Sequence, residues 1–287
     1  MDKCVPRIPG TSARAEESIL GPFRDRIWVP FLDAVRRYEL ISPGDRIAVC
    51  VSGGKDSMLL AKLMQMLARD GEIPFEAVFQ SMDPGYSPAN RAKLEENAAL
   101  LGIPLRIFET NVFDVANRQE HSPCYLCAKM RRGHLYAQAK EAGCGKIALG
   151  HHRNDVVETT VMAMFYGSQL QGMIPKLRST NFEEMELIRP LYRIREDDIV
   201  AWSRSNGLEF LQCACRFTEQ AEDGGGRESS KRREIKELLR ELGRTHPDVE
   251  ENVFRAVHAV EFDTFPGWKT EGVRHLFTEN PQESSDS

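Results

Sequence analysis

The sequence predicts an α/β protein built on a doubly wound parallel sheet of about five strands, with helical additions at both ends. Two observations predict this fold class. Short apolar runs, which are typical of buried parallel strands, alternate along the chain with longer amphipathic stretches. The first run, residues 47–51, leads through a glycine-containing turn into an apolar-rich helix. Hydrophobic residues make up 41% of the chain, so a sizeable core can form around such a sheet.

The expected elements follow from the spacing of apolar residues and from the turn residues between them. Apolar runs predict strands at residues 47–51, 75–82, 105–110, 146–149, 188–191 and 209–211. Helical periodicity predicts helices at residues 21–40, 58–67, 91–101, 129–142, 155–165, 195–206, 229–242 and 247–259. The first of these helices is amphipathic, because apolar residues recur at every fourth position from Phe23 to Val35.

Composition divides the chain into four segments. Residues 1–20 are expected to form a flexible arm, because most of them are polar and prolines are scattered among them. The strand pattern places the main domain at residues 21–220. A helical C-terminal extension is expected at residues 221–277, with a flexible joint at the three glycines 224–226, and a disordered tail at residues 278–287.

Charge and hydropathy exclude some classes of protein. The net charge of −5 argues against a generally basic nucleic-acid binder, so any RNA contact would depend on local clusters such as Lys129–Arg132. No run of about 18 apolar residues occurs, so no membrane span is expected. The N-terminus lacks the apolar core of a secretory signal, and we therefore expect a cytoplasmic protein.

The hexapeptide Ser-Gly-Gly-Lys-Asp-Ser at residues 52–57 predicts a phosphate-binding turn. Its two glycines allow a sharp turn, and the following helix start offers free N–H groups. Two hydroxyls and the Lys55 ammonium complete a cradle for an anion of phosphate size. The common P-loop needs a glycine at position 49, where this chain has Val49. A turn without a ligand is the alternative, but the full six-residue pattern between strand and helix favours a nucleotide site.

Two cysteine pairs indicate a second site. The chain contains Cys124-Tyr-Leu-Cys127 and Cys213-Ala-Cys215. Thiolates at these spacings can converge on one soft metal centre, either a zinc ion with four ligands or an iron–sulfur cluster with three. A redox dithiol and four cysteines buried as small apolar side chains remain as alternatives.

Several motifs together resemble a known family. Residues 52–57 resemble the PP-loop of the adenine-nucleotide alpha-hydrolase superfamily. With the segments at residues 123–133, 147–159, 164–167 and 173–178, the chain resembles the tRNA 2-thiocytidine synthetase family over roughly residues 22–215. The resemblance implies a fold of the HUP/PP-loop type. It also implies a cytosolic enzyme that replaces the C2 oxygen of cytidine 32 in the tRNA anticodon loop by sulfur, through an adenylated intermediate. The implied cofactors are ATP, Mg²⁺ and an oxygen-sensitive 4Fe–4S cluster, held by three cysteines, that delivers sulfide.

The resemblance also assigns roles to residues of the nucleotide site. The residues that it implies for ATP binding are Ser52, Gly53, Gly54, Lys55, Asp56, Ser57, Gly150, His151 and Asp155. Among them, Lys55 and Asp56 would act in catalysis, and Asp56 would also help to hold Mg²⁺. His151 and His152 are candidate general bases from their chemistry alone, but a histidine at a strand end is as often a packing residue.

The implied cluster ligands and catalytic thiols are Cys124 and Cys127. The third ligand is open, because the second cysteine pair is one residue shorter than the C-x-x-C of the family. We expect Cys213 to be this ligand, with Cys215 as the alternative. The implied partners are tRNA and a cysteine desulfurase or another sulfur donor. A homodimer is compatible with the resemblance, and no membrane partner is expected.

Other functions remain open at this point. Relatives that thiolate uridine carry additional zinc-binding cysteine pairs near both termini, whereas this chain has only Cys4 near its start and no cysteine after Cys215. A lysidine-type ligase shares the PP-loop but needs no cysteine centre. Thiolation of a different tRNA base and a non-catalytic metal or redox sensor that binds ATP are the remaining alternatives.

Overall fold

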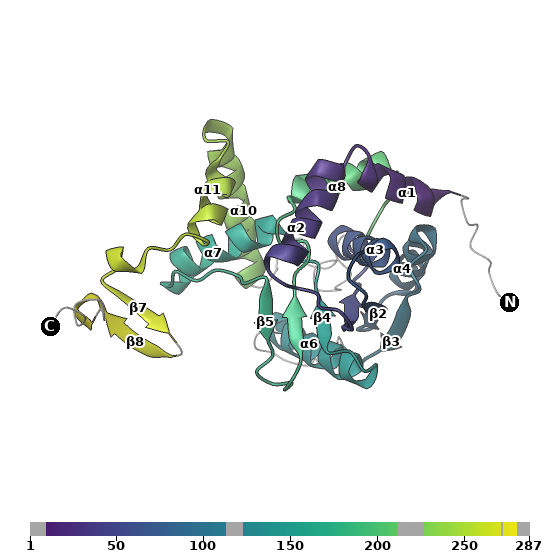
Figure 1. Ribbon diagram of the computed structural model, residues 1–287, viewed down its shortest axis with the longest axis horizontal. Coiled ribbons are helices and arrows are strands. Elements are labelled where there is room, and N and C mark those ends of the chain that lie inside the picture. Colours follow the sequence, from purple (N-terminus) through teal and green to yellow (C-terminus); the bar gives the residue numbers. More distant parts are fainter. Residues whose placement is uncertain (1–9, 113–122, 212–226, 271, 280–287) are drawn as a thin grey trace. The chain divides into compact units, whose positions relative to one another are not determined.

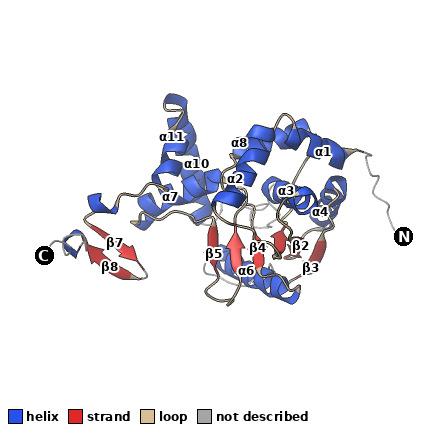
Figure 2. Ribbon diagram, in the orientation of Figure 1, coloured by secondary structure: helices blue, strands red, loops and turns tan. Residues whose placement is uncertain are grey.

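The structure is a computed structural model that describes residues 10–112, 123–211, 227–270 and 272–279. The chain divides into two compact units, residues 1–238 and 239–287. Figure 1 traces the chain by colour, and Figure 2 separates its helices from its strands. Every helix among the described residues is too short or too polar to span a bilayer.

A six-stranded sheet forms the centre of the first unit. Its strands are β1 (Arg46–Cys50), β2 (Glu76–Asp83), β3 (Arg106–Glu109), β4 (Lys146–Ala148), β5 (Lys176–Arg178) and β6 (Glu186–Ile188). They lie in the order β3-β2-β1-β4-β6-β5, and every neighbouring pair is parallel except β5 with β6. The predicted α/β class with a mainly parallel sheet is confirmed.

Helices cover both faces of this sheet, as a doubly wound fold requires (Figure 2). The described helices of this unit are α1 (Thr11–Leu20), the π-helical turn η1 (Arg24–Trp28), α2 (Val29–Arg37), α3 (Lys55–Asp70), α4 (Pro88–Leu101), α6 (Pro123–Glu141), α7 (Arg153–Gly167), α8 (Glu196–Ser205) and the first part of α10 (Arg227–Thr245). One core contains α1 to α4 and α8. The second core lies under α6, whose Tyr136 and Ala139 pack with Ala48 of β1 and Ile147 of β4.

The helix that follows the phosphate-binding turn is firmly held. Leu59, Leu60 and Leu63 of α3 are fully buried in the larger core. Burying a leucine side chain contributes roughly 1.5–3 kcal/mol, so this helix is anchored along its length. The turn at its N-terminus therefore has a fixed support.

The strand order places a ligand crevice between β1 and β4. The chain winds outward from β1 through β2 to β3, and then returns to the other side of β1 to form β4. In open α/β sheets ligands bind at such a switch point, beyond the carboxyl ends of the strands. The turn at residues 52–57 follows β1 directly, and residues 149–152 follow β4.

Some sequence predictions about strands are wrong. Residues 209–211 are not a strand, because the chain there leaves the sheet and Leu211 donates its backbone N–H to Gly53 instead. The strand predicted at residues 188–191 lies earlier, at Glu186–Ile188. The edge strand β5 was not predicted, since it is only three residues long and two of them are basic.

The prediction of a flexible arm at residues 1–20 is also partly wrong. Residues 11–20 form α1, and residues 1–9 lie outside the described part of the chain. Ala15 and Ile19, four residues apart, are fully buried and attach the helix to the core. The fully buried Lys62 of α3 bonds Glu16 and Ser12 of α1 at 2.5 and 2.8 Å, which fixes the helix further.

The second unit is not wholly helical. It contains the end of α10, α11 (Val249–Ala256), the 3-10 turns η2 (Phe262–Thr264) and η3 (Phe277–Glu279), and a hairpin of β7 (Gly267–Thr270) with β8 (Val273–Leu276). The hairpin corrects the helical expectation for these residues, and Trp268 stacks on His275 across it with ring centroids 5.4 Å apart. η3 also shows that residues 278 and 279 are ordered. The predicted domain boundary at residue 220 and the tail at 280–287 lie outside the described residues.

Candidate functional site

The turn between β1 and α3 has the geometry of an anion cradle. Gly53 has a φ of +86°, and a Cβ atom there would lie 2.6 Å from Cδ1 of Leu211. The positive φ favours glycine at this position, and the Leu211 side chain packs directly against it. The Ser57 hydroxyl accepts a hydrogen bond from the Ser52 amide at 3.1 Å and donates one to the Gly54 carbonyl at 2.9 Å. These bonds fix the turn, while the first amides of α3 remain without intrahelical acceptors.

The turn after β4 lies against this cradle. A Cβ atom on Gly150 would lie 3.1 Å from both the Asp56 carbonyl carbon and the Ser57 nitrogen. The two turns are thus in backbone contact, and only glycine at position 150 allows this spacing without displacement. These two turns flank the position at which the strand order leads us to expect a ligand crevice.

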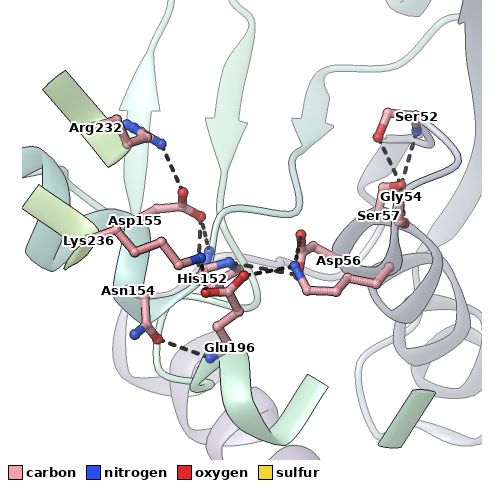
Figure 3. A network of polar contacts seen from close by, with 11 residues as sticks. Ser52, Gly54, Asp56, Ser57, His152, Asn154, Asp155, Glu196, Arg232 and Lys236 are labelled. Carbon is pink, nitrogen blue, oxygen red and sulfur yellow. Dashed lines mark hydrogen bonds and ion pairs between the residues drawn. The ribbon is translucent and has the colours of Figure 1, made fainter. Parts of the chain in front are cut away.

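His152 lies between two carboxylates at the start of α7 (Figure 3). Its Nε2 atom is 3.7 Å from Asp56 Oδ1, and its Nδ1 atom is 3.5 Å from Asp155 Oδ2. The His152 backbone also donates a hydrogen bond of 2.9 Å to Asp155 Oδ2. His152 therefore ties the phosphate-binding turn to the N-terminus of α7.

His151 occupies a different environment from its neighbour. Burial lowers its pKa to about 4, and the charges of Arg189 and Arg232 act in the same direction, against the opposing charge of Asp155. Its Nδ1 atom is buried without a hydrogen-bond partner among the described residues. The imidazole is therefore neutral near pH 7. A group with so low a pKa is a weak general base, which favours a role in packing or in hydrogen bonding.

Lys55 is held by two carboxylates. Its Nζ atom lies 3.1 Å from Asp56 Oδ2 and 3.0 Å from Oε1 of Glu196, the first residue of α8. The other oxygen of Glu196 bonds Nζ of Lys236 on α10 at 2.5 Å. Burial raises the pKa of Glu196, but bonds and charges from Lys236 and Lys55 outweigh it and hold the pKa at about 2. Burial lowers the pKa of Lys55, but the two carboxylates outweigh it and the net shift is upward.

The start of α10 brings a second cation to the crevice. Arg232 Nη1 lies 3.1 Å from Asp155 Oδ1 (Figure 3). Its Nη2 donates to the Thr159 hydroxyl at 3.4 Å. Glu234 accepts a hydrogen bond of 2.7 Å from the Tyr166 hydroxyl, and Ile235 is 1% exposed. α10 therefore packs along α7, with Arg232 and Lys236 one helical turn apart on the face toward the carboxylates.

The cysteine segments are only partly described. Cys124 and Cys127 lie in the first turns of α6. Because α6 is the crossover between the parallel strands β3 and β4, it begins at the carboxyl edge of the sheet, the edge that carries the phosphate-binding turn. Cys213 and Cys215 lie outside the described residues. The backbone bond of 3.1 Å from Leu211 to Gly53 nevertheless fixes the chain on the phosphate-binding turn two residues before Cys213.

The structure brings the predicted nucleotide residues together around the expected crevice. Residues 52–57 and residues 150–155 come from two turns that are in backbone contact. Sequence reasoning missed Glu196, Arg232 and Lys236, which reach the same crevice from α8 and α10. The sequence shows only that Arg232 and Lys236 are four residues apart, and this spacing does not identify the carboxylates that they bind. Among the described residues, no cluster of three or more histidine, cysteine or acidic side chains is arranged to hold a metal ion.

Comparison with known proteins agrees with this fold. The sequence profile of the PP-loop domain matches residues 31–215. The chain is also similar to the solved U34-tRNA thiolase NcsA from Methanococcus maripaludis with its 4Fe–4S cluster. The TM-score is 0.62 with 20% sequence identity, over 80% of this chain and 76% of that chain. At this identity the structural likeness concerns the fold alone.

Sequence relatives are more specific. The tRNA-cytidine(32) 2-sulfurtransferase of Alkalilimnicola ehrlichii is 37% identical over 232 residues, which cover 80% of this chain and 71% of the relative. The protein of the same name from Anaeromyxobacter dehalogenans is 36% identical over 229 residues, which cover 78% of this chain and 76% of the relative. With the PP-loop profile across the crevice-forming residues, these matches show that the chain belongs to the tRNA-cytidine(32) 2-sulfurtransferase family of PP-loop proteins.

Proposed function

We propose that this chain is an ATP-dependent sulfurtransferase that replaces the C2 oxygen of cytidine 32 in tRNA by sulfur. The C2 oxygen is a poor leaving group. Bond formation between this oxygen and the α-phosphorus of ATP releases pyrophosphate and activates C2. A sulfur nucleophile then forms a bond to C2, and AMP departs with the oxygen. The family relationship supports this chemistry, and the crevice supplies a site for the nucleotide.

The residues of the crevice fit a magnesium-bound nucleotide. The free amides of the first turn of α3 and the hydroxyl of Ser52 are suited to binding phosphate oxygens. Lys55 would stabilise charge that develops on the departing pyrophosphate. Asp56 Oδ1 is buried and accepts no hydrogen bond from the described residues, so it has a lone pair available for Mg²⁺. Gly150, His151 and Asp155 would line the nucleotide from the β4 side.

A single observation supports the link between ATP and sulfur chemistry. Leu211, two residues before Cys213, donates its backbone N–H to the Gly53 carbonyl, which favours a second cysteine pair near the phosphate-binding turn. The first pair begins α6 at the same edge of the sheet. Four thiols form a soft donor set, which fits an iron–sulfur cluster. We propose Cys124, Cys127 and Cys213 as its ligands. Such a cluster, when bound, supplies an iron position that can hold sulfur beside the activated base.

An anaerobic reaction with purified tRNA tests the proposed function. The expected products are 2-thiocytidine in the tRNA and one pyrophosphate for each base modified, both dependent on ATP. Lys55→Ala should form neither product. A protein that binds ATP without releasing pyrophosphate in the presence of tRNA would be a sensor and not an enzyme. Pyrophosphate release accompanied by thiolation at another base would keep the enzyme class and reject cytidine 32 as the target.

The identity of the third cluster ligand has its own test. Iron and acid-labile sulfide are measured in anaerobically purified Cys→Ser variants. Substitution of Cys124, Cys127 or Cys213 should remove the cluster, and substitution of Cys215 should leave it. Loss of iron from the Cys215 variant alone among the second pair would reverse this assignment. One zinc and no iron in the wild-type protein would reject the proposed cluster.

The remaining partners follow from this reaction. A cysteine desulfurase or another sulfur donor must renew the sulfur after each turnover, and tRNA is the macromolecular substrate. We place the protein in the cytoplasm because the proposed substrate is tRNA. A homodimer is part of the proposal, and sedimentation of the purified protein would detect it.

A further inference from the structure

One carboxylate joins the phosphate-binding turn to the C-terminal helix. Glu196 Oε1 lies 3.0 Å from Nζ of Lys55, and Glu196 Oε2 lies 2.5 Å from Nζ of Lys236. The Glu196 side chain is only 18% exposed. Its backbone nitrogen donates a hydrogen bond of 3.0 Å to Asn154 Oδ1, which holds it beside the start of α7 (Figure 3). Glu196 therefore has a fixed position between two ammonium groups.

This arrangement matters when Lys55 engages phosphate. Lys55 is bound to Asp56 and Glu196, so it must leave Glu196 in order to follow the phosphates of ATP. Leaving a mostly buried carboxylate without any cation beside it is strongly unfavourable. Glu196 does not reach that state, because Lys236 remains on its second oxygen. The cost of moving Lys55 is lower as a result.

We propose that Lys236 is a positioning residue of the nucleotide site, which acts through Glu196 to release Lys55 to the phosphates of ATP. The inference rests on the nucleotide site proposed above. It makes the C-terminal helix α10 a component of that site. Lys236 does not need to touch the ligand in order to change how tightly the ligand binds.

Other contacts hold Lys236 in place. Arg232, one helical turn earlier, bonds Asp155 at 3.1 Å, and the buried Ile235 lies between the two cations along the chain. The bond of 2.7 Å between Glu234 and Tyr166 adds a further attachment to α7. The start of α10 is therefore positioned by several independent contacts. Because these contacts do not involve Lys236, loss of the Lys236 charge should leave the helix packed against α7.

The test is ATP affinity, measured by isothermal titration calorimetry of the full-length, anaerobically purified protein with Mg²⁺. Lys236→Gln should weaken ATP binding roughly fivefold, the size expected when a partly exposed ion pair is lost. Inorganic pyrophosphate should show the same loss, and adenosine, which lacks phosphate, should show none. Lys236→Arg keeps the charge and should bind ATP as the wild type does. Arg233→Gln, which removes an exposed charge from the same helix, is the matched control and should also bind normally.

A double-mutant cycle separates the proposed relay from a direct contact or a general loss of structure. Glu196→Gln removes the carboxylate that competes for Lys55, so it should bind ATP at least as tightly as the wild type. In that background Lys236→Gln should change ATP affinity by less than twofold. An equal loss in both backgrounds, or no loss in either, would overturn the inference. If the wild-type protein does not bind ATP, the proposed function fails before this question arises.

Discussion

Replacement of Gly150 by alanine would place a methyl group between the two turns that form the proposed nucleotide site. The new Cβ atom would lie 3.1 Å from the Asp56 carbonyl carbon, 3.1 Å from the Ser57 nitrogen and 3.3 Å from the Asp56 carbonyl oxygen. All three neighbours are backbone atoms, so no side-chain rotation can relieve the crowding. The start of α3 or the turn after β4 must move by a few tenths of an ångström.

The size of the effect follows from this crowding. Overpacking of a closely packed site typically costs about 1–3 kcal/mol. For a protein of this size, about 1 kcal/mol lowers the melting temperature by roughly 2–4 °C. Because the displaced atoms include the amide of Ser57, ATP binding should suffer more than stability does. We expect ATP affinity to fall at least tenfold, together with a loss of roughly 2–12 °C in melting temperature.

Calorimetric titration with ATP and thermal denaturation measure the two effects. Gly145→Ala is the matched control, because it also adds one methyl group next to β4 but meets no atom within 4 Å. That control should bind ATP and unfold as the wild type does. If Gly150→Ala behaves like Gly145→Ala in both measurements, the contact between the two turns is not the basis of the site.

Three further predictions concern charge. Lys55→Ala should abolish ATP-dependent turnover while circular dichroism shows an intact fold, since Lys55 lies in the turn and not in the core; unchanged turnover would reject the nucleotide site. The pKa of His151 is about 4 in the folded chain and higher in the unfolded chain, so its contribution destabilises the fold as pH falls from about 6.5 to 4, by up to about 3 kcal/mol. His151→Gln should therefore flatten the pH dependence of unfolding measured across that window, and an unaltered profile would mean that the imidazole is not buried as described. Joint replacement of Arg131 and Arg132 by glutamine should weaken tRNA binding and reduce its salt dependence, whereas Lys140→Gln near the other end of α6 should not; an unchanged salt slope would mean that the RNA binds elsewhere.

Local sequence chemistry predicted the central part of the site. An apolar run, two glycines and an apolar helix define the turn at residues 52–57 without help from distant residues. The same is true of the amphipathic helices, and the apolar positions Phe23, Ile27, Phe31 and Val35 are all buried as expected. Where a pattern is contained within one segment, the sequence was sufficient to predict the structure.

Features that depend on distant partners were not predicted. Glu196 and Lys236 are 40 residues apart and become neighbours only through the fold. Residues 209–211 belong to no regular element, and their hydrogen bonds are to Gly53 and to the Asn97 side chain instead of to the sheet. The helix α1 was missed for a related reason. Its buried face consists of little more than Ala15 and Ile19, and its stability depends on Lys62.

The most direct measurement of the central claim is nucleoside mass spectrometry of total tRNA from a strain that lacks this gene. The account predicts that 2-thiocytidine disappears from the digested tRNA, because cytidine 32 then stays unmodified. The wild-type gene should restore the modification, and the Lys55→Ala variant should not. An unchanged level of 2-thiocytidine in the deletion strain, with loss of another thiolated nucleoside or of none, would contradict the assignment of this chain to cytidine 32.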